Sequence, residues 1–329
     1  MTEPPNDIKP PVTRNQWLGR AINVSIAIIL VVVLVNIIDF DTFADVLGRL
    51  SLPIVLAGFI VFVLLNLWRT LRYLALLDRD DLPIGRTFII SFYHNMMVRL
   101  LPFKLGELTY VVFMRNRLNV PPEEGLRSLF GSRLGELLVI ILVFSATLLI
   151  SSDVMPNQQG LAIIFAGIAI VGGIVGFYYS GAIGHFCVMI TRRLFGWLPI
   201  AGILDRLDAL ATDFERFQNA SMLAKSLLWS CFSYASSFAL VTILLMAVGV
   251  DVSLTTLITL ISISMFASAV PFNIAGFGTV EIGWTASLVA FAGYTAAEAA
   301  SIGLMINSFM LLAAIGTGIL SFLWLNLRQ

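Results

Sequence analysis

The sequence predicts an all-α polytopic membrane protein with about six full spans and two opposed re-entrant helical hairpins in an inverted-topology repeat. Three observations support this prediction: the composition, the length of the apolar runs, and the side on which basic residues fall. Hydrophobic residues make up 58% of the 329 residues and charged residues 12%, against about 25% charged in soluble domains. The mean hydropathy is +0.93. The chain therefore lacks the polar surface that a water-soluble fold requires.

Six apolar windows are long enough to cross a hydrocarbon core about 30 Å thick as helices. They are much longer than the ~10-residue alternating segments of a membrane barrel. Two further apolar regions, 87–115 and 255–291, are interrupted by proline, glycine and charged residues and do not fit simple spans. The six expected spans are 20–38, 53–77, 126–150, 160–179, 222–248 and 298–324.

The basic residues fall on one side of these spans, which the positive-inside rule assigns to the cytoplasm. Both termini are then cytoplasmic. Region 87–115 must enter and leave from the cytoplasm, and region 255–291 from outside, so both are predicted as re-entrant hairpins. The alternative is that proline and glycine only kink two continuous spans, which would put basic clusters on opposite sides. The clusters lie at 9–20, 69–86, 115–127, 192–216 and 328.

One folded domain, 17–329, is expected after a polar and proline-rich N-terminus, 1–16, that is predicted to be disordered. Its two halves have the same order of segments in opposite orientation. Repeat one covers about 17–152 and repeat two about 160–329. A cytoplasmic connection at about 181–221 contains apolar residues at helical spacing, which indicates an amphipathic linker helix: Ile203, Leu207, Leu210, Phe214 and Phe217.

The two hairpin tips are similar in sequence. Residues 101–107 read LPFKLGE and residues 270–276 read VPFNIAG. Inverted repeats with broken helices at matching positions are the architecture of many transporters, and the substrate binds where the repeats meet. The sequence therefore predicts a substrate site between the two tips.

Charged groups gather at these tips and at the start of the span after the first one. Ionisable groups at membrane depth cost at least ~2.5 kcal/mol on insertion scales and are candidates for function. A broken helix also exposes unpaired N–H groups and the positive end of its dipole, which suit an anion. The candidate substrate-binding residues are Arg99, Pro102, Lys104, Gly106, Glu107, Arg133, Glu136, Pro271, Asn273, Gly276, Gly278 and Glu281.

Among these candidates, Arg99, Lys104 and Arg133 are expected to hold a phosphate. The three glutamates would balance the cations, couple protons or bind an amine-bearing head group. The alternative is that the charges pair with one another and only fix the hairpins. Arg69 and Arg72, at the end of the second span, are expected to extend to lipid phosphates, with membership of the site as the alternative.

Other chemistry is not indicated by the sequence. Two cysteines and two histidines argue against a disulfide framework or a Cys/His metal centre, and the net charge of zero favours no nucleic-acid partner. The acidic string at 78–81 has no second string with which to bind a metal-bridged diphosphate. We expect no catalytic residue, no metal and no cofactor.

Three segments resemble the motifs of the lysylphosphatidylglycerol synthetase transmembrane (flippase-like) family. Residues 95–115 are similar to its Pro-x-Arg/Lys-x-Gly-Glu signature, and residues 269–281 to its Pro-x-x-x-Gly-Gly-x-Gly-x-x-Glu tip, with Ala275 replacing one glycine. Residues 131–138, GSRLGELL, resemble its Glu-Arg-x-x-Asp segment, with Ser132 at the first acidic position. The likeness covers nearly the whole chain from the first span onward.

The resemblance implies a multi-pass protein of the bacterial inner (cytoplasmic) membrane that moves a phospholipid or lipid-linked head group between leaflets. Some family members carry a further aminoacyl-transfer domain, which is not expected here because the chain stops at Gln329. The alternatives are a membrane-embedded transferase acting on a lipid phosphate, with Glu107 or Glu281 as base, and a non-catalytic partner of a cell-envelope enzyme. The expected partner is a membrane lipid with an anionic or amine-bearing head group; a homo-oligomer or an envelope-enzyme complex stays open.

Overall fold

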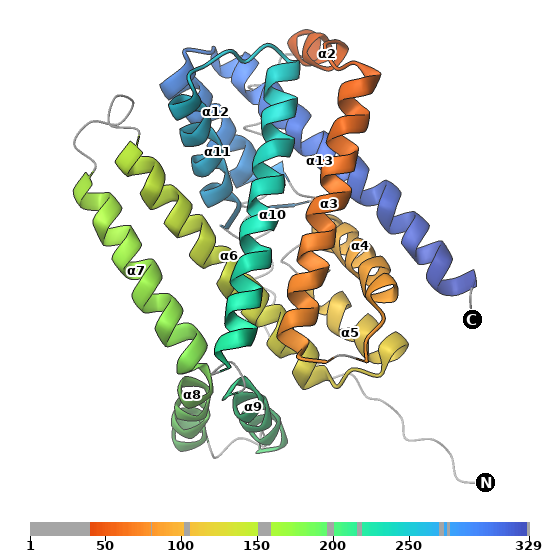
Figure 1. Cartoon of the computed structure of the whole chain (residues 1–329), viewed down its shortest axis with the longest axis vertical. Coiled ribbons are helices and arrows are strands. Elements are labelled where there is room, and N and C mark those ends of the chain that lie inside the picture. Colours follow the sequence, from red (N-terminus) through yellow and green to blue (C-terminus); the bar gives the residue numbers. More distant parts are fainter. Residues whose placement is uncertain are drawn as a thin grey trace.

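The computed structural model describes residues 40–79, 81–101, 106–150, 159–195, 201–215, 219–269, 273–274 and 277–327. The predicted first span, 20–38, and the predicted disordered segment, 1–16, lie outside the described residues. Within them, the chain forms twelve helices and one pair of two-residue strands (Figure 1). The predicted all-α class is confirmed.

Five helices of the described chain are long and apolar enough to cross a membrane. They coincide with the five predicted spans that fall on described residues, so these predictions are confirmed and the protein is a multi-pass integral membrane protein. The five are α3 (Leu52–Leu77), α6 (Pro122–Ile150), α7 (Gln159–Tyr178), α10 (Ala220–Ala247) and α13 (Ala296–Leu327).

Four shorter helices form two packed pairs, at the two regions that do not fit simple spans. Helix α4 (Ile84–Leu100) packs on α5 (Gly106–Leu118), and α11 (Leu254–Ala269) packs on α12 (Thr279–Ala292). In Figure 1, α4 and α5 lie in the lower half of the molecule and α11 and α12 in the upper half. Strand β1 (Asn273–Ile274) pairs antiparallel with β2 (Phe277–Gly278) between α11 and α12, a short strand pair that the sequence did not predict.

The remaining helices lie at the two ends of the long ones. Helix α2 (Phe40–Gly48) lies at the upper end in Figure 1, and α8 (Ser180–Phe195) and α9 (Ala201–Phe214) lie side by side at the lower end. Helix α9 is the predicted amphipathic linker helix. Leu204 is buried, and Leu210 and Phe214 of the predicted apolar face are half-buried, whereas Leu207 is 46% exposed.

Local sequence signals explain where several helices begin and end. Helix α3 begins after Ser51 with proline in its first turn and ends at Asp78, whose φ of 53° is left-handed. Asn219 caps the start of helix α10, because its side chain accepts hydrogen bonds from the backbone N–H groups of Ser221 and Met222. These signals lie at the ends of α3 and α10. The helices themselves continue without a break between their ends.

Two apolar clusters enclose the centre of the molecule. One joins α10, α11, α12 and α13 with the upper part of α3, and the other joins the lower part of α3 with α4, α5 and the start of α6. Trp284 of the first cluster and Tyr73 of the second both line a central cavity. The site therefore lies where the two clusters meet.

Candidate functional site: a polar cavity between the two helix pairs

A cavity of about 580 Å³ opens among the long helices α3, α6, α10 and α13 and the tips of both short pairs. One side of it is charged and the other is not. Among the described residues, its charged lining residues come from the first half of the chain: Arg69, Arg99, Glu107, Arg133 and Glu136. The second half contributes mainly hydroxyl, amide and apolar groups, including Ser233, Tyr234, Ser264 and Asn307.

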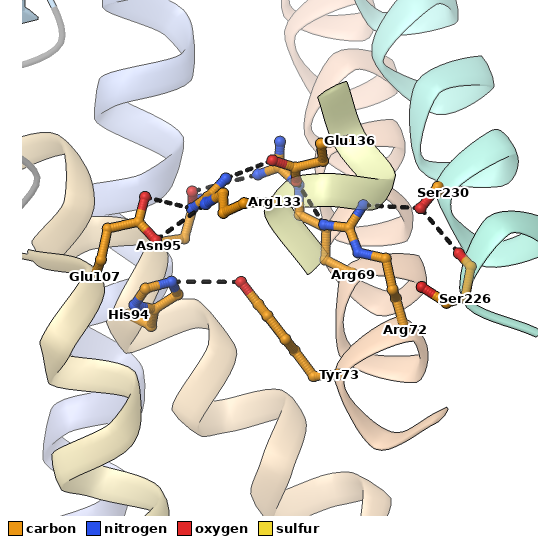
Figure 2. Close-up of polar contacts among 10 residues, drawn as sticks. All are labelled: Arg69, Arg72, Tyr73, His94, Asn95, Glu107, Arg133, Glu136, Ser226 and Ser230. Carbon is orange, nitrogen blue, oxygen red and sulfur yellow. Dashed lines mark hydrogen bonds and ion pairs between the residues drawn. The ribbon is translucent and has the colours of Figure 1, made fainter. Parts of the chain in front are cut away.

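An ion-pair chain runs along one wall of the cavity, and Figure 2 shows Arg133 lying between Glu107 and Glu136. Arg133 donates to both oxygens of Glu107, with Nη2 at 2.7 Å and Nε at 3.0 Å, and its Nη1 lies 2.5 Å from Glu136. The other oxygen of Glu136 accepts from Arg72, which is fully buried and also donates to Ser230. Two arginines therefore neutralise two carboxylates within one network.

Arg69 and Arg99 line the same cavity without such partners. Neither has a carboxylate within 4.0 Å among the residues that the structure describes. Each guanidinium has one long hydrogen bond to an asparagine: Arg69 to Asn95 at 3.5 Å and Arg99 to Asn307 at 3.4 Å. The Nε atom of each is buried with no hydrogen-bond partner in the described chain. Both cations therefore keep donors for a ligand in the cavity.

Glu281 lies just behind the cavity wall, in the first turn of α12, and is fully buried. Its Oε2 accepts from the backbone N–H of Gly278 at 2.6 Å, and its Oε1 accepts from Asn307 Nδ2 at 2.6 Å. Asn307 also accepts from Arg99, so its amide connects the tip of the α11–α12 pair to the tip of α4. This connection crosses between the two halves of the chain.

The tip of the α4–α5 pair is held by a close backbone approach. A Cβ atom on Gly106 would lie 2.2 Å from the carbonyl oxygen of Met97, so only glycine fits there. His94 contacts the carbonyl of Gly106 through Nδ1 at 3.2 Å and the hydroxyl of Tyr73 through Nε2 at 3.4 Å. These contacts fix the start of α5 and thereby direct Glu107 to Arg133.

Residues 20–318 match the family described as Lysylphosphatidylglycerol synthase TM region. The chain belongs to this family. The match includes every residue of the cavity and confirms the resemblance read from the motifs. No significant match is found among the curated proteins or among the solved structures.

The predicted site residues of this TM region divide into three groups. Four of them line the cavity: Arg99, Glu107, Arg133 and Glu136. Gly106, Gly278 and Glu281 lie beside it and shape its walls through the contacts described above. Pro102, Lys104, Pro271 and Gly276 lie outside the described residues, and Asn273 is described only by its backbone in β1. Whether any of them binds a ligand stays a prediction.

Sequence reasoning missed Arg69 and Arg72 as site residues. They were expected to extend to lipid phosphates, but Arg72 is fully buried in the ion-pair chain and Arg69 faces the cavity. A helical signal was available, because Asn66, Arg69 and Tyr73 are three and four residues apart and share one face of α3. Polar groups on one face of an otherwise apolar span indicate the side that faces the protein interior.

Proposed function

We propose that the protein moves a lipid with an anionic phosphate head group between the leaflets of the inner membrane. The observation that carries this proposal is the presence of two arginines without carboxylate partners, Arg69 and Arg99, on one cavity among the membrane-spanning helices. Guanidinium groups bind phosphate oxygens through charge-assisted and often bidentate hydrogen bonds. The acyl chains would stay among the surrounding lipids.

The cavity favours an anionic head group over an amine. An amine would need an available carboxylate, but both carboxylates that line the cavity already accept hydrogen bonds from arginines. Arg133 is occupied for the same reason, so phosphate binding is assigned to Arg69 and Arg99 rather than to Arg133. This assignment narrows the choice between anionic and amine-bearing lipids to the anionic class.

We further propose that the α4–α5 and α11–α12 pairs are the re-entrant hairpins of an inverted repeat, with both termini in the cytoplasm. Two features support this: each pair lies in a different half of the molecule, and the tips of both reach the same cavity. The arginine-bearing ends of α5 and α8 would face the cytoplasm. The head group would then reach the cavity from either side when one half moves against the other.

The hydrogen-bond partners of the carboxylates favour transport over the transferase alternative. A transferase would need a carboxylate positioned to take a proton from a substrate hydroxyl. Glu107 accepts two hydrogen bonds from Arg133, and Glu281 lies behind the lining of the cavity, so neither presents an available oxygen to a ligand. Formation of a covalent product from lipid phosphates in detergent would favour the transferase instead.

The test is lipid exchange in reconstituted vesicles. Fluorescently labelled phosphatidylglycerol, phosphatidylcholine and a polyprenyl phosphate are placed in vesicles, and a membrane-impermeant reductant reports the fraction in the outer leaflet. We expect the protein to speed the exchange of the anionic lipids and the Arg69→Ala/Arg99→Ala double variant to lose that activity. The exposed Arg192→Ala variant on α8 serves as the control. Exchange equal to that of protein-free vesicles for every lipid would refute the proposal.

A further inference from the structure

We propose that Glu281 takes up one proton when the anionic head group binds, and that Asn307 transmits the binding event from Arg99. The inference rests on the proposed function and adds the coupling ion and the residues that carry it. A proton bound together with the head group would make loading of the site depend on pH.

Glu281 differs from the other two carboxylates of the site in its partners. Glu107 and Glu136 are each in contact with arginine, whereas Glu281 has no cationic side chain within 4.0 Å in the described parts of the chain. Its two hydrogen-bond donors are neutral: a backbone N–H and the amide of Asn307. Buried carboxylates without a paired cation are the groups that membrane transporters use as proton carriers.

Within the part of the chain that the structure describes, the elements packed against α12 leave Glu281 with one charged neighbour. Helix α11 contains no charged residue, and the only charged residue of α13 between 296 and 327 is Glu298, which lies exposed near the start of that helix. The remaining charge is Arg99, which reaches Glu281 through the amide of Asn307. The ionised form of Glu281 is therefore stabilised by the same cation that faces the cavity.

The orientation of Asn307 makes the link directional. Arginine nitrogens can only donate, so the amide oxygen of Asn307 must face Arg99 and its nitrogen must face Glu281. In this arrangement the amide N–H and the charge of Arg99 both favour ionised Glu281 over a carboxyl that is protonated at Oε1. Burial of the group acts in the opposite direction, so a change of charge at Arg99 can alter the protonation of Glu281.

Head-group binding reverses this arrangement. When a phosphate accepts hydrogen bonds from Arg99, it compensates the positive charge and releases the oxygen of Asn307. Glu281 would then be a buried anion without compensation, and it takes a proton from water onto Oε1. The new O–H needs an acceptor, and the amide oxygen of Asn307 can supply it once Arg99 donates to the phosphate. No covalent bond of the lipid is formed or broken.

The experiment measures protons taken up during binding. Short-chain phosphatidylglycerol is titrated calorimetrically into the detergent-solubilised full chain, in two buffers of different ionisation enthalpy and at several pH values. We expect uptake approaching one proton per lipid and, where Glu281 titrates, about tenfold weaker binding for each unit that the pH rises. Glu281→Gln should bind the lipid with no proton uptake and no such pH dependence. Glu298→Gln, an exposed carboxylate near the start of α13, should behave as wild type.

A second variant covers the case in which Glu281→Gln does not fold. Asn307→Ala keeps Arg99 and Glu281 but removes the link, so it should bind the lipid while proton uptake is lost. Wild-type proton uptake in either variant would overturn the inference, as would lipid binding by the wild-type chain without any uptake. In both of those outcomes the proposed function stands. Absence of lipid binding by the wild-type chain would instead remove the proposed function and this inference with it.

Discussion

The two halves of the chain contribute opposite chemistry to one cavity. Among the described residues, the first half supplies the charged lining residues, held in an ion-pair chain or left with long hydrogen bonds to asparagine. The second half supplies serines, of which Ser264 bonds to Leu260 of its own helix, and a carboxylate behind the wall. Under the proposals above, similar arrangements of short helices carry different tasks: the first half binds the anion and the second responds to it.

This difference indicates how two halves of one chain can form an asymmetric site. Arginines on both sides of the cavity would repel one another across a low-dielectric space. The predictions below test this division, from the largest expected effect to the smallest.

The strongest test of the division is Glu136→Gln in the charged half. The change leaves Arg72 buried without a charged partner, which typically destabilises a protein by about 3–5 kcal/mol. Thermal unfolding in detergent, followed by tryptophan fluorescence, measures the loss. Ser264→Ala, at the cavity wall of the other half, is the matched control and should lose less than about 1 kcal/mol. Similar losses in both variants would show that the two halves do not differ as described.

Single arginine variants should sharpen the assignment of the anion site. Arg69→Ala and Arg99→Ala each remove a charge-assisted contact worth about 1.5–3 kcal/mol, or roughly 10- to 100-fold in affinity. Lysine at either position keeps the charge but loses the planar fork, so an intermediate loss is expected. Calorimetric titration with short-chain phosphatidylglycerol measures the change. A Ser233→Ala variant that weakens binding as much would move the anion site to the second half.

Glycines at the two tips should respond differently to substitution. In the first half, Gly106→Ala puts a methyl group 2.2 Å from the backbone oxygen of Met97, and such overpacking costs about 1–3 kcal/mol. In the second half, Gly283→Ala meets the methyl group of Ala267 at 2.7 Å, where a small helix shift can relieve the contact. In thermal unfolding, the melting temperature of Gly106→Ala should be lower than that of Gly283→Ala. Gly85→Ala, which has open space around it, should be neutral.

The smallest effect is expected at the start of α13, away from the cavity. Thr295 and Glu298 bond to each other across the first turn, so Thr295→Val should cost about 1 kcal/mol. Thermal unfolding in detergent measures the difference between the variant and the wild type. A loss as large as that of Glu136→Gln would contradict this ranking.

The spans could be predicted because apolar length alone decides them, as the agreement of 126–150 with α6 shows. The contribution of Glu107 and Glu136 could also be anticipated, because charge within an apolar segment is visible in the sequence. The residues with which they interact could not be predicted from the sequence. Arg99 bonds to Asn307 and Trp68 to Ser236 across sequence separations of 208 and 168 residues, so these contacts depend on how helices cross. The division between paired and unpaired arginines is likewise a property of packing.

Under the proposed function, the charge of the Glu281–Arg99 site determines which energy source can drive transport. The described residues place four arginines and three glutamates at the site, which leaves one excess positive charge when it is empty. A phosphodiester with one negative charge, accompanied by one proton, leaves that excess unchanged. The lipid and the proton together then carry no net charge across the membrane. Each uncompensated charge would instead be subject to about 2.3 kcal/mol per 100 mV of membrane potential. A pH difference between the two compartments, rather than the voltage, would then set the direction in which the lipid accumulates.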